Sequence, residues 1–484
     1  MKKIIYIACI CVAAMSCKKD ITDLNQSPKD PTYVPSAALF TNATVNLSDV
    51  MASTNVNNNN FRLFVQYWTE TIYRDETRFN LNQRSIPDRW FATFYRDVIE
   101  DLTTASKVAE TETLTLTAGQ IKNRKAINDI LISYAYYTLL TTFGNVPYTD
   151  ALNIENIQPK YDDAATVYAA IIAKLDAALA SIDVDEAGYG AGDVLLSDNT
   201  AAWVKFGNSL KFRMAMTIID VDFETAKTMI TDAAPNVIAD NSENIKMNYI
   251  TSPPNTNPVW EDLVQSGRYD FVAAKPFVDS LLANNDPRLK YYFNTAITPG
   301  GYVGQAPGAR AAYNNFSGPS STLAAKDFPH TYFSYAEMEL LKAEAIERGI
   351  ALDGSAEEHY NNAIDASVVE WGGTLEEALA YREQPTVAYT TASGDYKQKL
   401  GVQSWYVLYN RGYDEWTQWR RLDYPVLDLP SGAEANFDDD ETPAVITRMT
   451  YPVVEQNLNK ANYNAASAAI GKDQKTQKLW FDKY

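Results

Sequence analysis

Apolar residues recur every three or four positions along much of this sequence, and this is the spacing of one face of an α-helix. In the segment 90–108, for example, that face holds Trp90, Phe94 and Val98. Period-two patterns, which predict strands, are few and short, and the best of them covers residues 387–391. The pattern therefore predicts a mainly α-helical protein.

Several of the predicted helices follow one another as pairs. A helix over 121–143 is stopped by Gly144, the segments 165–182 and 200–219 form one pair, and 335–348 and 356–371 form another. Antiparallel helix pairs are the unit of tetratricopeptide-type repeats, although a period of about 34 residues is not evident here. We expect tetratricopeptide-like helix pairs.

Two stretches break the helical pattern. Residues 249–329 are rich in Pro and Gly, which keep helices short, and also in Tyr, Phe and Asn. A second irregular zone covers 71–88, between two helical stretches. Long irregular segments inside a folded domain are usually functional. We therefore expect the 249–329 insert to face a ligand together with the 71–88 loop.

The first seventeen residues predict the cellular location of the protein. Lys2 and Lys3 precede an apolar run over 4–15, and small residues lead to Cys17. This is the layout of a bacterial lipoprotein signal, in which residues 1–16 are removed and Cys17 is acylated. An ordinary secretory signal with an incidental cysteine is the alternative. Residues 17–35 then form a proline-bearing tether, and residues 36–484 form a single domain in which no stretch is expected to cross a membrane.

Charge and motifs exclude several classes of protein. Lys plus Arg number 42 and Asp plus Glu 61, a net charge of −19, which argues against nucleic-acid binding. The chain has two histidines and no motif for nucleotide binding, zinc proteases or serine hydrolases, so we predict no enzyme and no resident cofactor or metal. The acidic run 438–441 is expected to be a solvated loop, with a structural calcium site as the alternative.

The aromatic residues carry more information about function. Aromatics make up 12% of the chain, and a flat aromatic ring can contact the apolar face of a sugar while amides, acids and arginines serve its hydroxyl rim. The alternative is that each ring packs in the core, which we expect for Trp203 and Trp416. Aromatic residues in the loops, together with neighbouring Asn and Arg, are the candidate ligand contacts. They are Tyr73, Arg74, Arg78, Asn80, Trp260, Tyr269, Tyr302, Tyr313 and Asn315, and Phe79 in the same loop fits the pattern as well.

Blocks along nearly the whole chain resemble the SusD/RagB family of nutrient-binding lipoproteins, in its starch-binding, outer-membrane-associated branch. They include AYYTLLTTFGNVPYTDAL at 135–152, AAWVKFGNSLKFRMAM at 201–216, NDPRLKYYF at 285–293, YAEMELLKAEA at 335–345 and GYDEWTQWRRLDYPVL at 412–427. The resemblance implies four tetratricopeptide-like helix pairs with an irregular ligand-facing part. It also implies a SusC-like TonB-dependent transporter as partner, over which the protein acts as a lid, and no catalysis.

The function expected from residues and resemblance together is a glycan-binding lipoprotein of the outer membrane, anchored by lipid. Lys18, Lys19 and Asp20 after the cysteine resemble a signal for export to the outer face of that membrane. Three alternatives stay open: an importer subunit for peptides or other nutrients, a scaffolding lipoprotein, and a surface glycoside hydrolase. The last lacks any block that resembles a hydrolase family.

Overall fold

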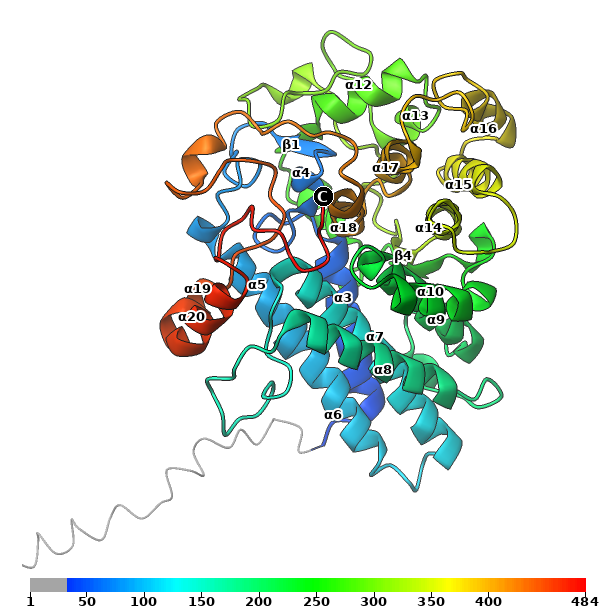
Figure 1. The fold of residues 1–484 in the computed structure, drawn as a ribbon, viewed down its shortest axis with the longest axis vertical. Helices are drawn as coiled ribbons and strands as arrows, with labels where there is room; N and C mark the ends of the chain where they lie inside the picture. Colours follow the sequence, from blue (N-terminus) through cyan, green and yellow to red (C-terminus); the bar gives the residue numbers. More distant parts are fainter. Residues whose placement is uncertain (1–32) are drawn as a thin grey trace, which may run out of the picture. The chain divides into compact units, whose positions relative to one another are not determined.

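The computed structural model describes residues 33–484, and the chain is mainly helical there, as predicted (Figure 1). Residues 36–484 form one compact unit. The predicted signal segment, the lipidation site Cys17 and the tether up to residue 32 lie outside the described residues.

The predicted helices form close to their expected bounds. The 90–108 face lies on a continuous helical run made of α5 (Ile86–Ala92), the π-helical turns of η2 (Thr93–Ile99) and α6 (Glu100–Ala109). The segments predicted as pairs become α8 (Ala164–Ser181) and α9 (Thr200–Ile218), and α14 (Tyr335–Glu347) and α15 (Ala356–Glu370). The α14–α15 pair forms as predicted, whereas α8 packs mainly on α7 (Ala118–Phe143) and α9 mainly on α10 (Phe223–Ala233).

Local chemistry fixes the ends of these helices. At the start of α7 the Thr117 hydroxyl accepts a hydrogen bond from the Gln120 backbone N–H, and the Gln120 side-chain oxygen accepts one from the Thr117 backbone N–H. The helix ends where Gly144 adopts a φ of +88°, which a side chain would oppose. A reciprocal cap of this kind also begins α16 (Leu375–Arg382). A single side-chain oxygen caps the start of α8, α9, α14, α15, α10 and α17 (Tyr396–Val407).

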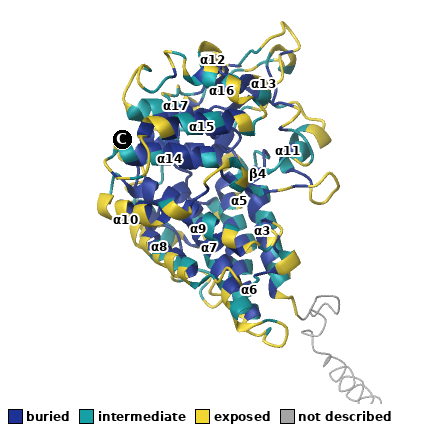
Figure 2. Cartoon of the chain, turned by 90° about the vertical axis from the view of Figure 1, so that its right-hand side faces the viewer, coloured by how far each residue is buried: buried dark blue, intermediate teal, exposed yellow. Residues whose placement is uncertain are grey.

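Neighbouring helices pack pairwise. α7 packs on α8, α9 on α10, α14 on α15, and α17 on α18 (Gly412–Leu422), while α3 (Ser36–Ala52) lies along α6. Figure 2 shows buried residues filling α14 and the inner faces of α7 and α9, with exposed residues on the outer faces of α8 and α10. These four pairs fit the helix-pair architecture, and their assignment as tetratricopeptide-like repeats stays a prediction.

One helix departs from the expectation about membranes. By length and composition α8 is apolar enough to cross a bilayer, contrary to the sequence prediction that no stretch of the domain is. In the fold α8 buries Val167, Ile171 and Leu175, a stripe at helical spacing, against the neighbouring helices. A core-packing helix passes the same test of length and composition, so the test alone does not place α8 in a membrane.

The few strands connect the irregular insert to the helical body. Strand β2 (Ile245–Met247) pairs antiparallel with β4 (His330–Phe333), so the two ends of the 249–329 insert lie side by side. Within the insert, β3 (Phe271–Ala273) pairs antiparallel with β1 (Trp68–Glu70). The longest of the insert's helices is α12 (Lys275–Ala283), with α11 (Pro258–Trp260), η6 (Glu261–Gln265) and α13 (Leu289–Tyr292) all shorter.

The strand predicted at 387–391 is wrong. These residues form consecutive turns, in which the Val387 backbone N–H donates to Gln384. Val387 is buried in a cluster with Tyr360 and Tyr381 of α15 and α16. The β-branched residue that suggested a strand is therefore used for packing against helices.

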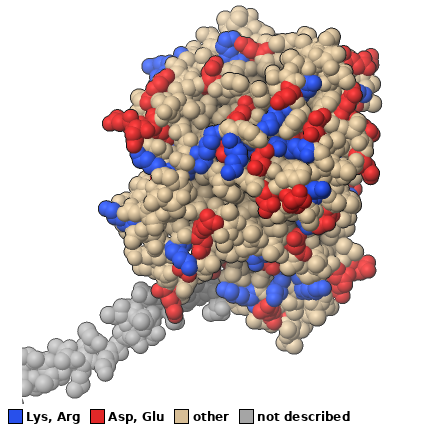
Figure 3. All heavy atoms as spheres, viewed as in Figure 1, with Lys and Arg blue, Asp and Glu red and all other residues tan. Residues whose placement is uncertain are grey.

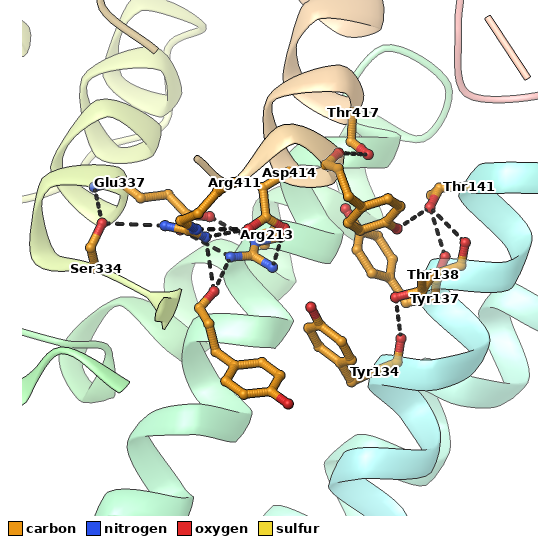
Figure 4. A network of polar contacts seen from close by, with 12 residues as sticks. Tyr134, Tyr137, Thr138, Thr141, Arg213, Ser334, Glu337, Arg411, Asp414 and Thr417 are labelled. Carbon is orange, nitrogen blue, oxygen red and sulfur yellow. Dashed lines mark hydrogen bonds and ion pairs between the residues drawn. The ribbon is translucent and has the colours of Figure 1, made fainter. Parts of the chain in front are cut away.

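A buried ionic network joins three of the helices (Figure 4). Arg213 of α9 donates to Glu337 of α14 and to Asp414 of α18, and Arg411 donates to the same two carboxylates. All four side chains are nearly inaccessible to solvent. Two positive and two negative charges thus balance one another at the centre of the body.

Short segments complete the helical part of the described chain, and they connect or cover the elements above. These are α4 (Phe61–Phe64), η1 (Asn82–Arg84), η3 (Gly190–Gly192), η4 (Ala234–Asn236), η5 (Asn241–Glu243), η7 (Tyr313–Asn315), η8 (Glu434–Asn436), α19 (Val453–Leu458) and α20 (Lys460–Ala469).

Candidate ligand-binding site

The pairing of β1 with β3 brings the two irregular zones together. Glu70 lies opposite Phe271, and the ladder continues one step beyond the strands, where the Thr71 N–H donates to the Asp270 carbonyl at 2.8 Å. On the other side of this segment, Ala311 donates to the Thr71 carbonyl at 3.0 Å. The start of the 71–88 loop is therefore held between two parts of the insert, and the expectation that the two zones face a ligand together stays a prediction.

Three of the predicted tyrosines lie on these neighbouring segments. The rings of Tyr269 and Tyr313 pack against each other with centroids 5.1 Å apart, and Tyr73 follows two residues after the Thr71 contact. Tyr73 is 58% exposed and Tyr269 65%, which is unusual for rings of this size. We call Tyr73, Tyr269 and Tyr313 the tyrosine patch.

A cavity of about 260 Å³ opens beside the tyrosine patch. Tyr73 lines it, and so do residues on both sides of Tyr269. Its wall is polar and mixed in charge, which suits a ligand with many hydroxyl groups. The lining residues are Thr54, Asn55, Val56, Asn57, Glu70, Tyr73, Arg84, Asp262, Leu263, Ser266, Arg268, Asp270 and Phe271.

Two carboxyl groups lie under one wall of this cavity. Glu70 and Glu76 are both buried, and burial together with the neighbouring Glu76 raises the pKa of Glu70 to about 9. Burial also raises the pKa of Glu76, against the effect of Arg84, whose Nε lies 3.1 Å from Glu76 Oε1. Because two adjacent carboxylates repel each other, the pair holds a proton at neutral pH.

The opposite wall is organised by two further acids. Arg268 Nε lies 2.7 Å from Asp270 Oδ2, and both groups face the cavity. Asp262 accepts hydrogen bonds at 3.1 Å from the backbone N–H and the hydroxyl of Thr54. Asp262 thereby holds the 54–57 loop in place as part of the wall.

The predicted polar contacts in the 71–88 loop mostly have partners within the protein. Arg78 donates through Nε and Nη2 to the Gly308 carbonyl, at 3.1 and 2.9 Å, and Arg74 donates to the same oxygen at 3.1 Å. Asn80 donates to the Gln83 side chain at 2.9 Å. The two arginines thus tie the loop to the insert, so that their first role in the fold is to support the site.

The other predicted residues lie apart from the cavity wall. Trp260 is half-buried with Lys326 Nζ 4.7 Å from its ring, and Tyr302 is half-buried against the core. Asn315 is exposed at the end of the turn that carries Tyr313.

The prediction that Phe79 contacts a ligand is wrong. Phe79 is fully buried, and its ring packs against Phe64 and Phe437. Trp203 and Trp416 are buried, as predicted.

Sequence reasoning missed the 54–57 loop, Arg84 and Arg268 as parts of the wall. The loop lies at the start of an asparagine-rich stretch, 55–60, which was a usable signal because amides suit a hydroxyl-rich ligand. Arg84 lies inside the zone already singled out. For Arg268 the neighbouring Tyr269 was the available signal.

The acidic run 438–441 is engaged with side chains of the C-terminal segment. Asp440 pairs with Lys472, and Glu441 accepts from the N–H and hydroxyl of Thr476. Within residues 33–484 no three His, Cys, Asp or Glu side chains gather as a metal ion would require. On the face in Figure 3 acidic and basic side chains are interspersed, unlike the continuous basic stripe of a nucleic-acid binder.

Comparison with known proteins identifies the family. A family model described as starch-binding associating with outer membrane, SusD-like, matches residues 28–452. No curated protein matches the sequence, but solved structures do.

Three of the matching structures have 22% sequence identity to this chain, and identity this low shows the fold alone. A SusD homologue from Bacteroides uniformis aligns with a TM-score of 0.77 over 92% of this chain and 99% of its own. A chitin-binding SusD homologue from Flavobacterium johnsoniae gives 0.76 over 92% and 98%. A SusD-like protein from Bacteroides thetaiotaomicron gives 0.74 over 93% and 99%. The chain belongs to the SusD/RagB family, in its SusD-like branch.

Proposed function

We propose that this protein binds glycans at the tyrosine patch and the cavity beside it. The observation that carries the proposal is an exposed Tyr73 on the wall of a cavity lined by amides, acids and arginines, with the packed pair Tyr269–Tyr313 on the adjoining segments. Aromatic faces contact the apolar faces of sugar rings, and the polar wall serves their hydroxyls. The description of the family as starch-binding and the chitin-binding homologue add support.

The role in uptake is the finer part of the proposal. The protein, anchored at the outer membrane through an acylated Cys17 and facing the cell exterior, captures an oligosaccharide or polysaccharide. It then delivers the glycan to a SusC-like TonB-dependent transporter and acts as the lid of that transporter. The chain itself is a binding protein without catalysis, and energy comes from the transporter's own partner.

Titration calorimetry of the purified domain, residues 36–484, tests the binding step. Maltoheptaose and chitohexaose represent the two glycan classes that the comparisons name, and a mixture of neutral peptides of similar size represents the alternative importer. We expect saturable binding of one oligosaccharide and none of the peptides. Peptide binding with no response to either sugar would favour the importer of peptides. Release of reducing ends during the titration would favour the hydrolase.

A further inference from the structure

A second cavity lies away from the tyrosine patch and shares no lining residue with it. It has a volume of about 190 Å³ and lies where the end of the insert meets the helical body, between β4, the end of α15 and the junction of α17 with α18. An apolar cavity of roughly 150 Å³ holds one benzene molecule, so there is room here for a single six-membered ring.

One wall of this cavity is aromatic. Trp371, Phe328 and Tyr409 contribute it, with ring centroids 5.7 Å apart for Phe328 and Trp371 and 5.6 Å apart for Trp371 and Tyr409. Trp371 and Phe328 are partly exposed, whereas Tyr409 is buried and forms the floor. A ligand with an apolar ring face can therefore lie against the aromatic wall.

Hydrogen-bond donors with unused capacity also line the cavity. Asn410 is 8% exposed; its Oδ1 accepts from Arg62 at 2.8 Å, while its Nδ2 donates to no described residue. Arg411 Nη1 has a single contact, a long one of 3.4 Å to the Ser334 hydroxyl (Figure 4). Asn410 and Arg411 both line the cavity, so each has a donor that can form a further hydrogen bond with a ligand oxygen.

The backbone at this point is also specialised. Asn410 has a φ of +69°, in the left-handed region that non-glycine residues rarely adopt. Such conformations persist where the surrounding structure fixes them, often at ligand sites. Here the left-handed residue presents its amide at the cavity.

Charge around the cavity is balanced. Lys246 and Glu370 at its edge form an ion pair of 2.8 Å, and Arg411 is neutralised by Glu337 and Asp414. A free anion or cation would therefore find no net opposite charge. An uncharged ring can accept hydrogen bonds from Asn410 and Arg411 through its oxygen atoms and donate from a hydroxyl to Glu370.

We propose that this cavity binds one neutral pyranose ring, either a free monosaccharide or the terminal sugar of a longer glycan. The site is distinct from the tyrosine patch, and its occupancy ties the end of the insert to the helical body. The inference does not depend on the glycan-binding role of the tyrosine patch, because no residue is common to the two sites.

Two substitutions remove the site in different ways. Asn410→Asp keeps the acceptor for Arg62 and tolerates a positive φ, but it replaces the Nδ2 donor by an oxygen. Thr322→Trp places a large ring at the exposed edge of the cavity and fills it. Tyr269→Ala is the matched control, because it alters the tyrosine patch alone.

Saturation-transfer NMR of residues 36–484 with glucose, galactose, mannose and N-acetylglucosamine, each at millimolar concentration, reads out binding. We expect at least one monosaccharide to bind the wild type and the Tyr269→Ala variant alike, with affinity lowered about tenfold or more in Asn410→Asp and in Thr322→Trp. Thermal unfolding of each variant, unchanged within a few degrees, shows that the fold is retained. The matching disaccharides distinguish a free sugar from a chain end, since only a chain-end site accepts both.

Three results would overturn the proposal. These are no binding of any of the four sugars to the wild type, undiminished binding in both folded cavity variants, and loss of binding in Tyr269→Ala alone. The last result would assign the monosaccharide to the tyrosine patch. The proposed glycan-binding function would survive all three, because it is measured separately with the oligosaccharides.

Discussion

Arg213 of α9 and Glu337 of α14 form a two-pronged ion pair in the interior, with Nε 2.7 Å from Oε1 and Nη2 2.9 Å from Oε2. The same Glu337 carboxylate also accepts from Arg411 at 2.6 Å. Burial alone would raise the pKa of Glu337, but the two guanidinium groups outweigh it and hold the pKa below its ordinary value. Glu337 therefore stays charged and links α14 to α9 and to the start of α18.

The first prediction concerns this carboxylate. In Glu337→Gln the new amide group faces two buried arginines that have lost a counter-charge. Breaking a buried ion pair on one side costs about 3–5 kcal/mol, so the urea midpoint should fall sharply. Glu110→Gln is the control, because the Lys125–Glu110 pair is half-exposed and surface pairs contribute little. Equal midpoints for the two variants would contradict the role given to the network.

A second prediction concerns Glu70 at the edge of the candidate site. With a pKa of about 9 in the folded state and an ordinary value near 4.5, Glu70 binds more protons folded than unfolded between these limits. Stability must therefore fall as pH rises through that window. Glu70→Gln keeps an oxygen for Thr77 but cannot ionise. The variant should gain stability over the wild type between about pH 5 and about pH 8 in urea titrations. If the stability of the wild type and of Glu70→Gln changed with pH in parallel, Glu70 would be ionised in both the folded and the unfolded state, and the prediction would fail.

The third prediction concerns His359, whose contribution to stability also falls as pH rises. Burial lowers the pKa of His359, but its contacts at 2.7 Å with Glu339 Oε2 and with the Asp353 carbonyl outweigh this and raise it. A raised histidine pKa contributes stability below the ordinary value near 6.5, and this contribution is lost as pH rises through the folded pKa. The stability difference between wild type and His359→Gln should shrink from about pH 5 to about pH 8. A difference that grows with pH would contradict the assigned contacts.

The fourth prediction concerns the anchor. Cys17→Ala removes the acylation site in the full-length protein and should move it from the membrane fraction to the medium or periplasm. A multiply acylated cysteine holds a protein stably, whereas one chain binds only marginally. Cys11→Ala, a substitution within the predicted signal, is the matched control and should stay in the membrane fraction. Full membrane attachment of Cys17→Ala would refute the lipoprotein assignment.

Local patterns predicted the helices well because the signals that define them are local. The end of α7 at Gly144 and the pairing of α14 with α15 follow from nearby residues and short turns. The strand predicted at 387–391 failed because Val387 packs in a cluster with Tyr360 of α15, which is distant in sequence, and with Tyr381 of the adjacent α16. Propensity yields to such tertiary contacts.

The candidate site was predictable in kind but not in composition. Irregular backbone with aromatics indicated the 71–88 loop and the insert, and the structure places the segments that carry Tyr73, Tyr269 and Tyr313 next to one another. These segments are neighbours because β1 pairs with β3 in a particular register. The two strands are far apart in the sequence and short, so neither segment alone predicts that pairing. Phe79 resembled its exposed neighbours in sequence, yet its positive φ turns the chain so that the ring packs inside.

The most direct test of the account is the affinity of the tyrosine patch for the oligosaccharide that binds in calorimetry. Tyr73→Ala, Tyr269→Ala and Tyr313→Ala should each weaken binding about fivefold or more, since a stacked ring contributes on the order of 1 kcal/mol, and should leave the melting temperature nearly unchanged. Trp203→Ala, a core truncation, should instead cost about 3–5 kcal/mol of stability. Normal affinity in all three folded tyrosine variants would contradict the account and place the glycan site elsewhere.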